Sequence, residues 1–160
     1  MVRGIGGGLM GAALMVALAA PSSRDPVPDP KYSAADVVGI VLHALQHNDE
    51  PTADHGIAVT FAFASPANRQ STGPLERFTV LVKNPDYRVM LGARSAHRDP
   101  IDIVGRRARQ RVTVVSATGE TRVFIFMLTK QEGGPYNGCW MTDGVMREPP
   151  PTLPPGVTAT

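Results

Sequence analysis

Two histidines four residues apart carry the clearest metal-binding spacing in this chain. On a helix, His43 and His47 would project from one face, and imidazole is a common zinc ligand. Asp36 and Glu50 share that face, and His55 follows shortly after. The face lies opposite a stripe of valine and leucine, so we expect it to face water. Because a closed site needs three or four convergent ligands, we predict an exposed polar stripe and no bound metal.

A row of arginines follows in the second half of the chain. Arg107, Arg109 and Arg111 would point to one side of a strand, about 6.6–7 Å apart. The next strand, residues 122–130, contains no acid to neutralise them. Such a row could capture an anionic ligand, a lipid surface or a partner. We favour the alternative of a solvated face helped by acids from other strands. The acids available are Asp102 and Asp143. No aromatic residue alternates with the arginines, so we expect no nucleic-acid binding.

The composition is that of one globular domain with an uneven charge distribution. The chain has 160 residues, of which 42% are hydrophobic and 19% charged, as in soluble single domains. Residues 24–54 hold six acids against two basic residues, whereas residues 69–111 hold ten basic residues against four acids. One part of the surface should therefore be acidic and another basic. Cys139 is the single cysteine, which excludes an intrachain disulfide and predicts a buried small hydrophobic residue.

Both ends differ in composition from the middle of the chain. Residues 1–20 have a basic start, an apolar middle and an Ala-Leu-Ala-Ala end, the three parts of a secretory-type signal. We expect export or organelle targeting rather than location in the cytoplasm. A glycine-rich leader without a targeting role and an uncleaved anchor, the one expected membrane contact, are the alternatives. Residues 21–32 read as a proline-rich linker and residues 148–160 as a disordered proline-rich tail, which leaves a folded domain over residues 33–147.

Capping residues mark the starts of several helices. Ser33 is a good N-cap with Asp36 in the first turn, and Ser65 precedes a proline that suits the first helical position. Gly73 and Pro74 open a further helix. The expected helices cover residues 33–48, 54–64, a single turn from Ser65, and 74–84. Within residues 54–64, apolar side chains also occur at alternate positions (Val59, Phe61 and Phe63), so a strand is the alternative there.

The C-terminal half predicts strands joined by tight turns. The expected strands cover residues 87–95, 101–104, 106–115, 122–131 and 139–146. Residues 122–131 are apolar on both faces, which is typical of a central strand. Helices must cover one face, and the other needs a dimer partner or a lined cavity. The sequence therefore predicts an α+β fold, with N-terminal helices packed on a curved antiparallel sheet.

Five short runs carry a resemblance to a known family. They are Ala64–Arg69, Leu75–Phe78, Tyr87–Arg88, Gln110–Val112 and Cys139–Asp143. In this order and spacing they resemble an uncharacterised family of short bacterial and plant-plastid proteins, over about residues 33–147. The family is a domain of unknown function in the nuclear-transport-factor-two-like, or cystatin-like, superfamily. The resemblance implies a conical fold and favours a plastid location, including the thylakoid lumen. The family is similar in fold to ketosteroid isomerase and scytalone dehydratase, and also to many non-catalytic binding modules.

The cone that this resemblance implies would hold a cavity between sheet and helices. We expect polar and aromatic residues around its mouth, namely Arg69, Tyr87, Gln110, Trp140 and Asp143. Arg69, Gln110 and Trp140 are the candidates for binding a small anionic or apolar ligand.

Two functions of different classes are compatible with these residues. We favour a non-catalytic binding or assembly module, dimeric through its sheet and without a cofactor, because no convergent acid/base set is visible. The alternative is a small-molecule lyase or isomerase in which Asp143 acts with Tyr87 or with His97, which lies near Asp99. The enzyme hypothesis requires a polar-lined pocket of roughly several hundred cubic ångströms.

Overall fold

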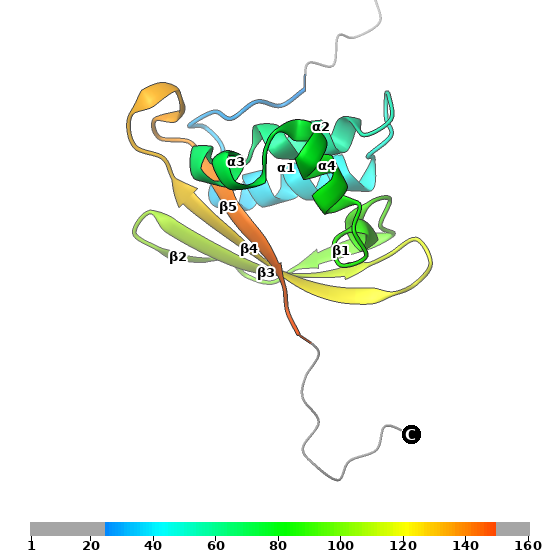
Figure 1. The fold of residues 1–160 in the computed structure, drawn as a ribbon. Coiled ribbons are helices and arrows are strands. Elements are labelled where there is room, and N and C mark those ends of the chain that lie inside the picture. The colour runs from blue at the N-terminus through cyan, green and yellow to red at the C-terminus, as the bar shows by residue number, and fades with distance from the viewer. Residues whose placement is uncertain (1–24, 150–160) are drawn as a thin grey trace, which may run out of the picture.

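The computed structural model describes residues 25–149, in which four helices precede a five-stranded sheet. The helices lie together over one face of the sheet (Figure 1), which confirms the predicted fold class. The helices are α1 (Ala34–Gln46), α2 (His55–Ala62), α3 (Pro66–Thr72) and α4 (Leu75–Val82). The strands are β1 (Ser95–Arg98), β2 (Asp102–Val104), β3 (Arg107–Val115), β4 (Thr121–Lys130) and β5 (Trp140–Arg147). The predicted targeting segment, residues 1–20, and most of the proline-rich tail lie outside the described residues.

The first helix begins as its capping residues predict. The Ser33 hydroxyl accepts a hydrogen bond from the Asp36 amide at 3.1 Å, and the Asp36 carboxylate accepts one from the Ser33 amide at 2.9 Å. Hydrogen bonds from Ser33 also lower the pKa of Asp36. The helix buries one apolar face against the sheet and α2, formed by Val37, Val38, Val41, Leu42 and Leu45.

The sheet is antiparallel, and its order is β1-β3-β4-β5. β2 pairs with the other end of β3. β4 is central, and its Phe124, Phe126 and Leu128 are buried beneath the helices. The predicted faces of β3 are confirmed, because its arginines are exposed while Ala108, Gln110, Val112 and Val114 are buried.

The outer face of β4 is closed at its middle by the chain itself. Ile125 is only 5% exposed, although no helix lies on this side of the sheet (Figure 1). Its register partners are Arg111 on β3 and Met146 on β5, and both have long side chains that can cover it. Val123 and Met127, on either side, are half-buried. The sequence pattern required a dimer partner or a lined cavity over this face of β4. At Ile125 neither is needed, because the side chain is already buried.

The expected strand over residues 87–95 is wrong. The chain forms a 3-10 turn, η1 (Arg88–Met90), and the strand begins only at Ser95. The Asn84 side chain accepts hydrogen bonds from the amides of Asp86 (2.9 Å) and Tyr87 (3.2 Å), which holds a turn. Gly92, at φ 62°, then donates its amide to the Leu45 carbonyl at 3.0 Å. Side-chain turn chemistry has overridden the β propensity of Tyr87 and Val89.

Two glycines provide a test of the contact between α1 and α2. A Cβ at Gly56 would overlap the backbone carbonyl of Ala44, which cannot move without shifting α1, and would lie 2.9 Å from the Asn48 Cα. A Cβ at Gly39 would meet only the flexible end of Arg98, 3.0 Å from Nη1.

We therefore expect Gly56→Ala to lower the free energy of unfolding by about 3 kcal/mol or more. Gly39→Ala should leave it unchanged or raise it by up to about 1 kcal/mol, through helix propensity. Urea unfolding of both variants measures the difference. Equal losses would show that α1 and α2 do not approach this closely.

Candidate functional site

A cavity of about 220 Å³ lies between the inner face of the sheet and the helices. Its wall is mostly apolar, with contributions from α1, α4, η1 and the central strand. These apolar residues are Val41, Leu45, Phe78, Leu81, Val82, Met90 and Phe126. The polar side of the wall comes from α2, α3 and β5, and includes Thr60, Asn68, Ser71, Thr72 and Thr142. The cavity is thus an apolar space with polar groups gathered on one side.

The polar side is built by docking the start of α3 on the free edge of β5. The Ser65 amide donates to the Thr142 carbonyl at 2.9 Å, and the Thr142 amide donates to the Phe63 carbonyl at 2.8 Å. Ala64 forms a parallel bridge to Thr142. The Asn68 side-chain amide adds a 3.0 Å bond to the same Thr142 carbonyl. Residues 63–68 therefore engage both the amide and the carbonyl of Thr142.

The Thr142 hydroxyl, in contrast, has no partner. The residue is 5% exposed, and no group within residues 25–149 hydrogen-bonds its Oγ1. The hydroxyls of the other lining residues are used. Thr60 donates to the Gly56 carbonyl (2.8 Å), Thr72 and Ser71 to the Asn68 carbonyl (2.8 and 2.9 Å), and Tyr87 to the Val145 carbonyl (3.0 Å). Buried polar atoms are nearly always paired, so this hydroxyl requires an explanation.

Two of the five residues expected around the mouth line this cavity, Tyr87 and Asp143. Asp143 occupies the position where the β4–β5 register shifts, opposite Met127 and Leu128. It is exposed and accepts a hydrogen bond from the Thr129 hydroxyl. Tyr87 is half-buried and its hydroxyl is engaged with a backbone carbonyl. Neither group hydrogen-bonds the other.

His97 is not brought to this site. It lies on β1, which β3 and β4 separate from β5 in the sheet. Its side chain is 80% exposed, and its Nε2 is 3.7 Å from the Asp99 carboxylate. The structure therefore pairs His97 with Asp99 at the surface and leaves it apart from Tyr87 and Asp143.

The three residues expected to bind ligand do not line the cavity. Arg69 donates to the carbonyls of Ala64 (2.8 Å) and Ala62 (3.2 Å), and its guanidinium lies 4.9 Å from the centre of the Tyr136 ring. Gln110 is buried and donates to the Asp99 carbonyl at 2.7 Å. Trp140 is buried in the core. Each makes contacts that hold the fold together. Beside Trp140, burial also raises the pKa of the Cys139 thiol, as expected for a small core residue.

The arginine row lies on the outer face of the sheet, as predicted, and one member is paired. Arg111 bonds Glu148 through Nε at 2.7 Å and approaches Asp99 through Nη1 at 3.4 Å. These carboxylates raise the pKa of Arg111. Asp102 lies opposite Arg109 in the β2–β3 register. Within residues 25–149, no ion pair involves Arg107 or Arg109.

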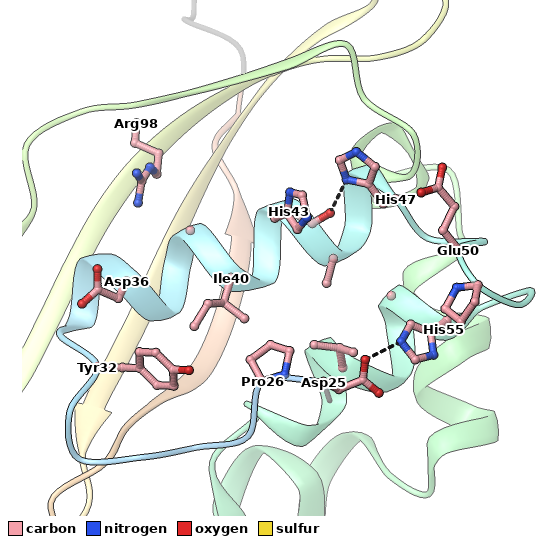
Figure 2. Close-up of a pocket in the computed structure, with 15 residues that line it drawn as sticks. Asp25, Pro26, Tyr32, Asp36, Ile40, His43, His47, Glu50, His55 and Arg98 are labelled. Atoms are coloured by element: carbon pink, nitrogen blue, oxygen red, sulfur yellow. Dashed lines mark hydrogen bonds and ion pairs between the residues drawn. The ribbon is translucent and has the colours of Figure 1, made fainter. Parts of the chain in front are cut away.

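The histidines border a separate, open groove of about 960 Å³ between α1, α2 and the segment before α1 (Figure 2). The rings of His43 and His47 lie 4.3 Å apart on the exposed side of α1, which confirms the exposed stripe. His55 instead pairs with Asp25 at 2.8 Å. In the part of the chain that the structure describes, no three histidine, cysteine or acidic side chains are arranged to hold a metal ion.

Comparison with known proteins identifies the family. Residues 29–151 match the model of a domain of unknown function, DUF4864, so the chain belongs to this family. The match covers the whole α+β domain, including the cavity. No curated protein and no solved structure matches the chain. None of the helices within residues 25–149 has the length and hydrophobicity to span a membrane.

The unpaired Thr142 hydroxyl leads to a stability prediction. Replacing it by a methyl group of similar size removes a polar atom that is buried without a partner. We therefore expect Thr142→Val to raise the free energy of unfolding by about 1 kcal/mol, measured by urea unfolding of the full chain. Thr113→Val, at a half-buried position on the outer face, is the matched control and should change it by less than about 0.5 kcal/mol. A clear loss in Thr142→Val alone would mean that the hydroxyl is paired in solution.

Proposed function

We propose that this protein is a non-catalytic binding module that encloses a small molecule in the cavity between its helices and its sheet. The observation that carries the proposal is the cavity itself, whose wall is mostly apolar and carries a few polar residues on one side. Cavities that combine apolar walls with a few oriented polar groups are the usual form of small-molecule sites.

The chemistry of the lining supports binding rather than acid/base catalysis. A general base must reach the proton that it removes, and its partner acid must be free to act. The Tyr87 hydroxyl is engaged with the Val145 carbonyl, and the exposed Asp143 is engaged with Thr129. These facts favour the binding module.

The surroundings of the cavity suit a preformed site. The polar side rests on the backbone bonds between residues 63–65 and Thr142, and the apolar side on the packed faces of α1 and α4. Tyr87 also stacks on Phe124, with ring centres 6.0 Å apart. A site built on helices and strands in this way holds its shape without the ligand.

A blocked cavity tests the proposal. Val82 lines the cavity from α4 and is 4% exposed, whereas Val80, on the same helix, is 72% exposed. Val82→Phe should fill part of the cavity, and Val80→Phe adds the same atoms at the surface. We expect toluene, titrated into the full chain, to shift amide resonances of α1, α4 and β5. Its affinity should fall by about tenfold or more in Val82→Phe and stay unchanged in Val80→Phe.

The amide spectrum of each variant also reports whether it is folded, because overpacking can cost about 1–3 kcal/mol. If toluene shifts no cavity resonances in the wild type, the proposal is wrong. It is equally wrong if a folded Val82→Phe binds toluene as well as the wild type does.

Self-association through the outer face of the sheet is a second candidate, supported by the apolar side chains there. Met146 is 53% exposed, and Val104 and Met127 border a groove of about 420 Å³ on this face. The groove contains both signs of charge, from Arg107, Arg109, Asp102 and Asp143. Because a two-fold interface brings one surface against itself, arginines of one copy can meet acids of the other.

This candidate predicts a dimer that one charge change per strand disrupts. The full chain should elute as a dimer in size exclusion with light scattering at about 10 μM, where a micromolar dimer is populated. Met127→Lys with Met146→Lys should give a monomer, since each added charge would lose hydration in the interface. Val80→Lys, on the exposed side of α4, is the control and should remain dimeric. A wild-type monomer under these conditions would exclude the pairing.

A further inference from the structure

The tip of the β2–β3 hairpin exposes two adjacent apolar residues. Ile103 is 48% exposed and Val104 is 74% exposed. Gly105, at φ 59°, forms the turn, and all of residues 102–107 are exposed where the hairpin extends past the helices (Figure 1). Single apolar residues are ordinary on a protein surface, whereas adjacent ones at a protruding turn indicate a contact surface.

The two apolar side chains lie on opposite sides of the sheet, because consecutive residues of a strand alternate. Val104 pairs with Arg107 and borders the groove on the outer face. Ile103 pairs with the buried Ala108 and lies on the side of the helices. A second copy packed flat on the outer face would cover Val104 and leave Ile103 in water. A partner that covers both side chains must enclose the tip.

Basic side chains flank the tip on both sides. Arg107 and Arg109 lie on the outer face, and within residues 25–149 neither forms an ion pair. Lys130 alternates with the buried Leu128 along β4 and therefore lies on the helix side. Its amide donates to the Arg106 carbonyl at 2.8 Å, which places it beside the turn.

The acids near the tip do not balance these basic residues. Glu132 forms an ion pair with Arg106, and Asp102 lies opposite Arg109 in the β2–β3 register. Asp143 also borders the outer groove, but it belongs to β5, the edge strand opposite to β2. Four basic residues against two acids leave the tip with a net positive charge, which favours an anionic partner.

An apolar tip between basic side chains is suited to the surface of an anionic bilayer. There, apolar side chains leave water at the acyl boundary, while arginine and lysine stay at the level of the phosphates. A fluid bilayer also encloses both sides of a hairpin without a preformed pocket. Beyond the proposed cavity function and independently of it, we infer that this hairpin inserts Ile103 and Val104 into the surface of an anionic phospholipid membrane.

A tryptophan at the tip tests the insertion. Val104→Trp is compared with Val80→Trp, which adds the same side chain at an exposed position on α4. Both full-length variants are mixed with vesicles of roughly two parts phosphatidylcholine to one part phosphatidylglycerol, with acyl chains brominated near the headgroups. Bromine quenches a tryptophan that enters the bilayer, and the buried Trp140 gives both variants the same background. We expect quenching of Val104→Trp and none of Val80→Trp.

The contribution of charge is measured in the Val104→Trp chain by titrating the same vesicles. Arg107→Gln with Arg109→Gln should weaken vesicle binding by about tenfold or more. Arg88→Gln with Arg94→Gln removes the same charge from exposed positions, and the Arg94 amide bonds Val115, at the other end of β3. This control pair should weaken binding by less than about threefold. Vesicles of phosphatidylcholine alone should bind about tenfold more weakly or less, because they lack the surface potential.

Several results would overturn the inference. It is wrong if the tip tryptophan is not quenched, or if Val80→Trp is quenched equally. Vesicles that sediment with the chain while the tip stays unquenched would assign the attachment to another segment, such as residues 1–20. Equal losses in the two arginine pairs would mean attraction by net charge alone, which also contradicts insertion at the hairpin. None of these results changes the proposal for the cavity.

Discussion

The backbone of Thr142 is the point on which the architecture depends. β5 forms one edge of the sheet, and an edge strand presents unpaired amides and carbonyls to its surroundings. Here the edge is occupied by residues 63–65, through bonds of 2.8 Å to the Phe63 carbonyl and 2.9 Å from the Ser65 amide. The same contact ends α2, starts α3 and brings the Asn68 side chain onto the Thr142 carbonyl. Protection of the sheet edge and placement of the helical layer above the cavity are thus one interaction.

This interaction also explains why the Thr142 hydroxyl lacks a partner. The Asn68 side chain is hydrogen-bonded to Thr142, but its amide donates to the Thr142 carbonyl and not to the hydroxyl. Its own carbonyl groups accept the hydroxyls of Thr72 and Ser71. The Gln110 side-chain oxygen is also buried and unpaired, yet Gln110 lines neither the cavity nor the groove on the outer face. An unpaired buried atom therefore indicates no ligand by itself.

Local signals in the sequence predicted much of the fold. The caps at Ser33 and Ser65 start helices where expected, and alternation along residues 106–115 assigns the faces of β3 correctly. The prediction failed at residues 87–95, where the Asn84 side chain holds a turn. From residue type alone, the sequence analysis correctly placed Tyr87 and Asp143 at the cavity. It missed Thr142 and Asn68, because their roles depend on contact between segments more than seventy residues apart, as in the bond between Asn68 and Thr142. Arg69, Gln110 and Trp140 attracted attention by type, but the fold engages each of them.

The surface features and the cavity differ in how their polar groups are balanced. Arg111 meets two carboxylates, and His55 meets Asp25, so these groups are paired at positions where water also solvates them. Exposed ion pairs contribute about 0–1 kcal/mol to the stability of the fold, so these charged groups do not require a binding partner to explain them. A hydroxyl buried without a partner costs about 1–3 kcal/mol, and a valine would fill nearly the same space without that cost. The fold itself gains nothing from a hydroxyl at position 142. The mostly apolar cavity is not accounted for in this way, and the proposed function therefore rests on it rather than on the arginine row or the histidine groove.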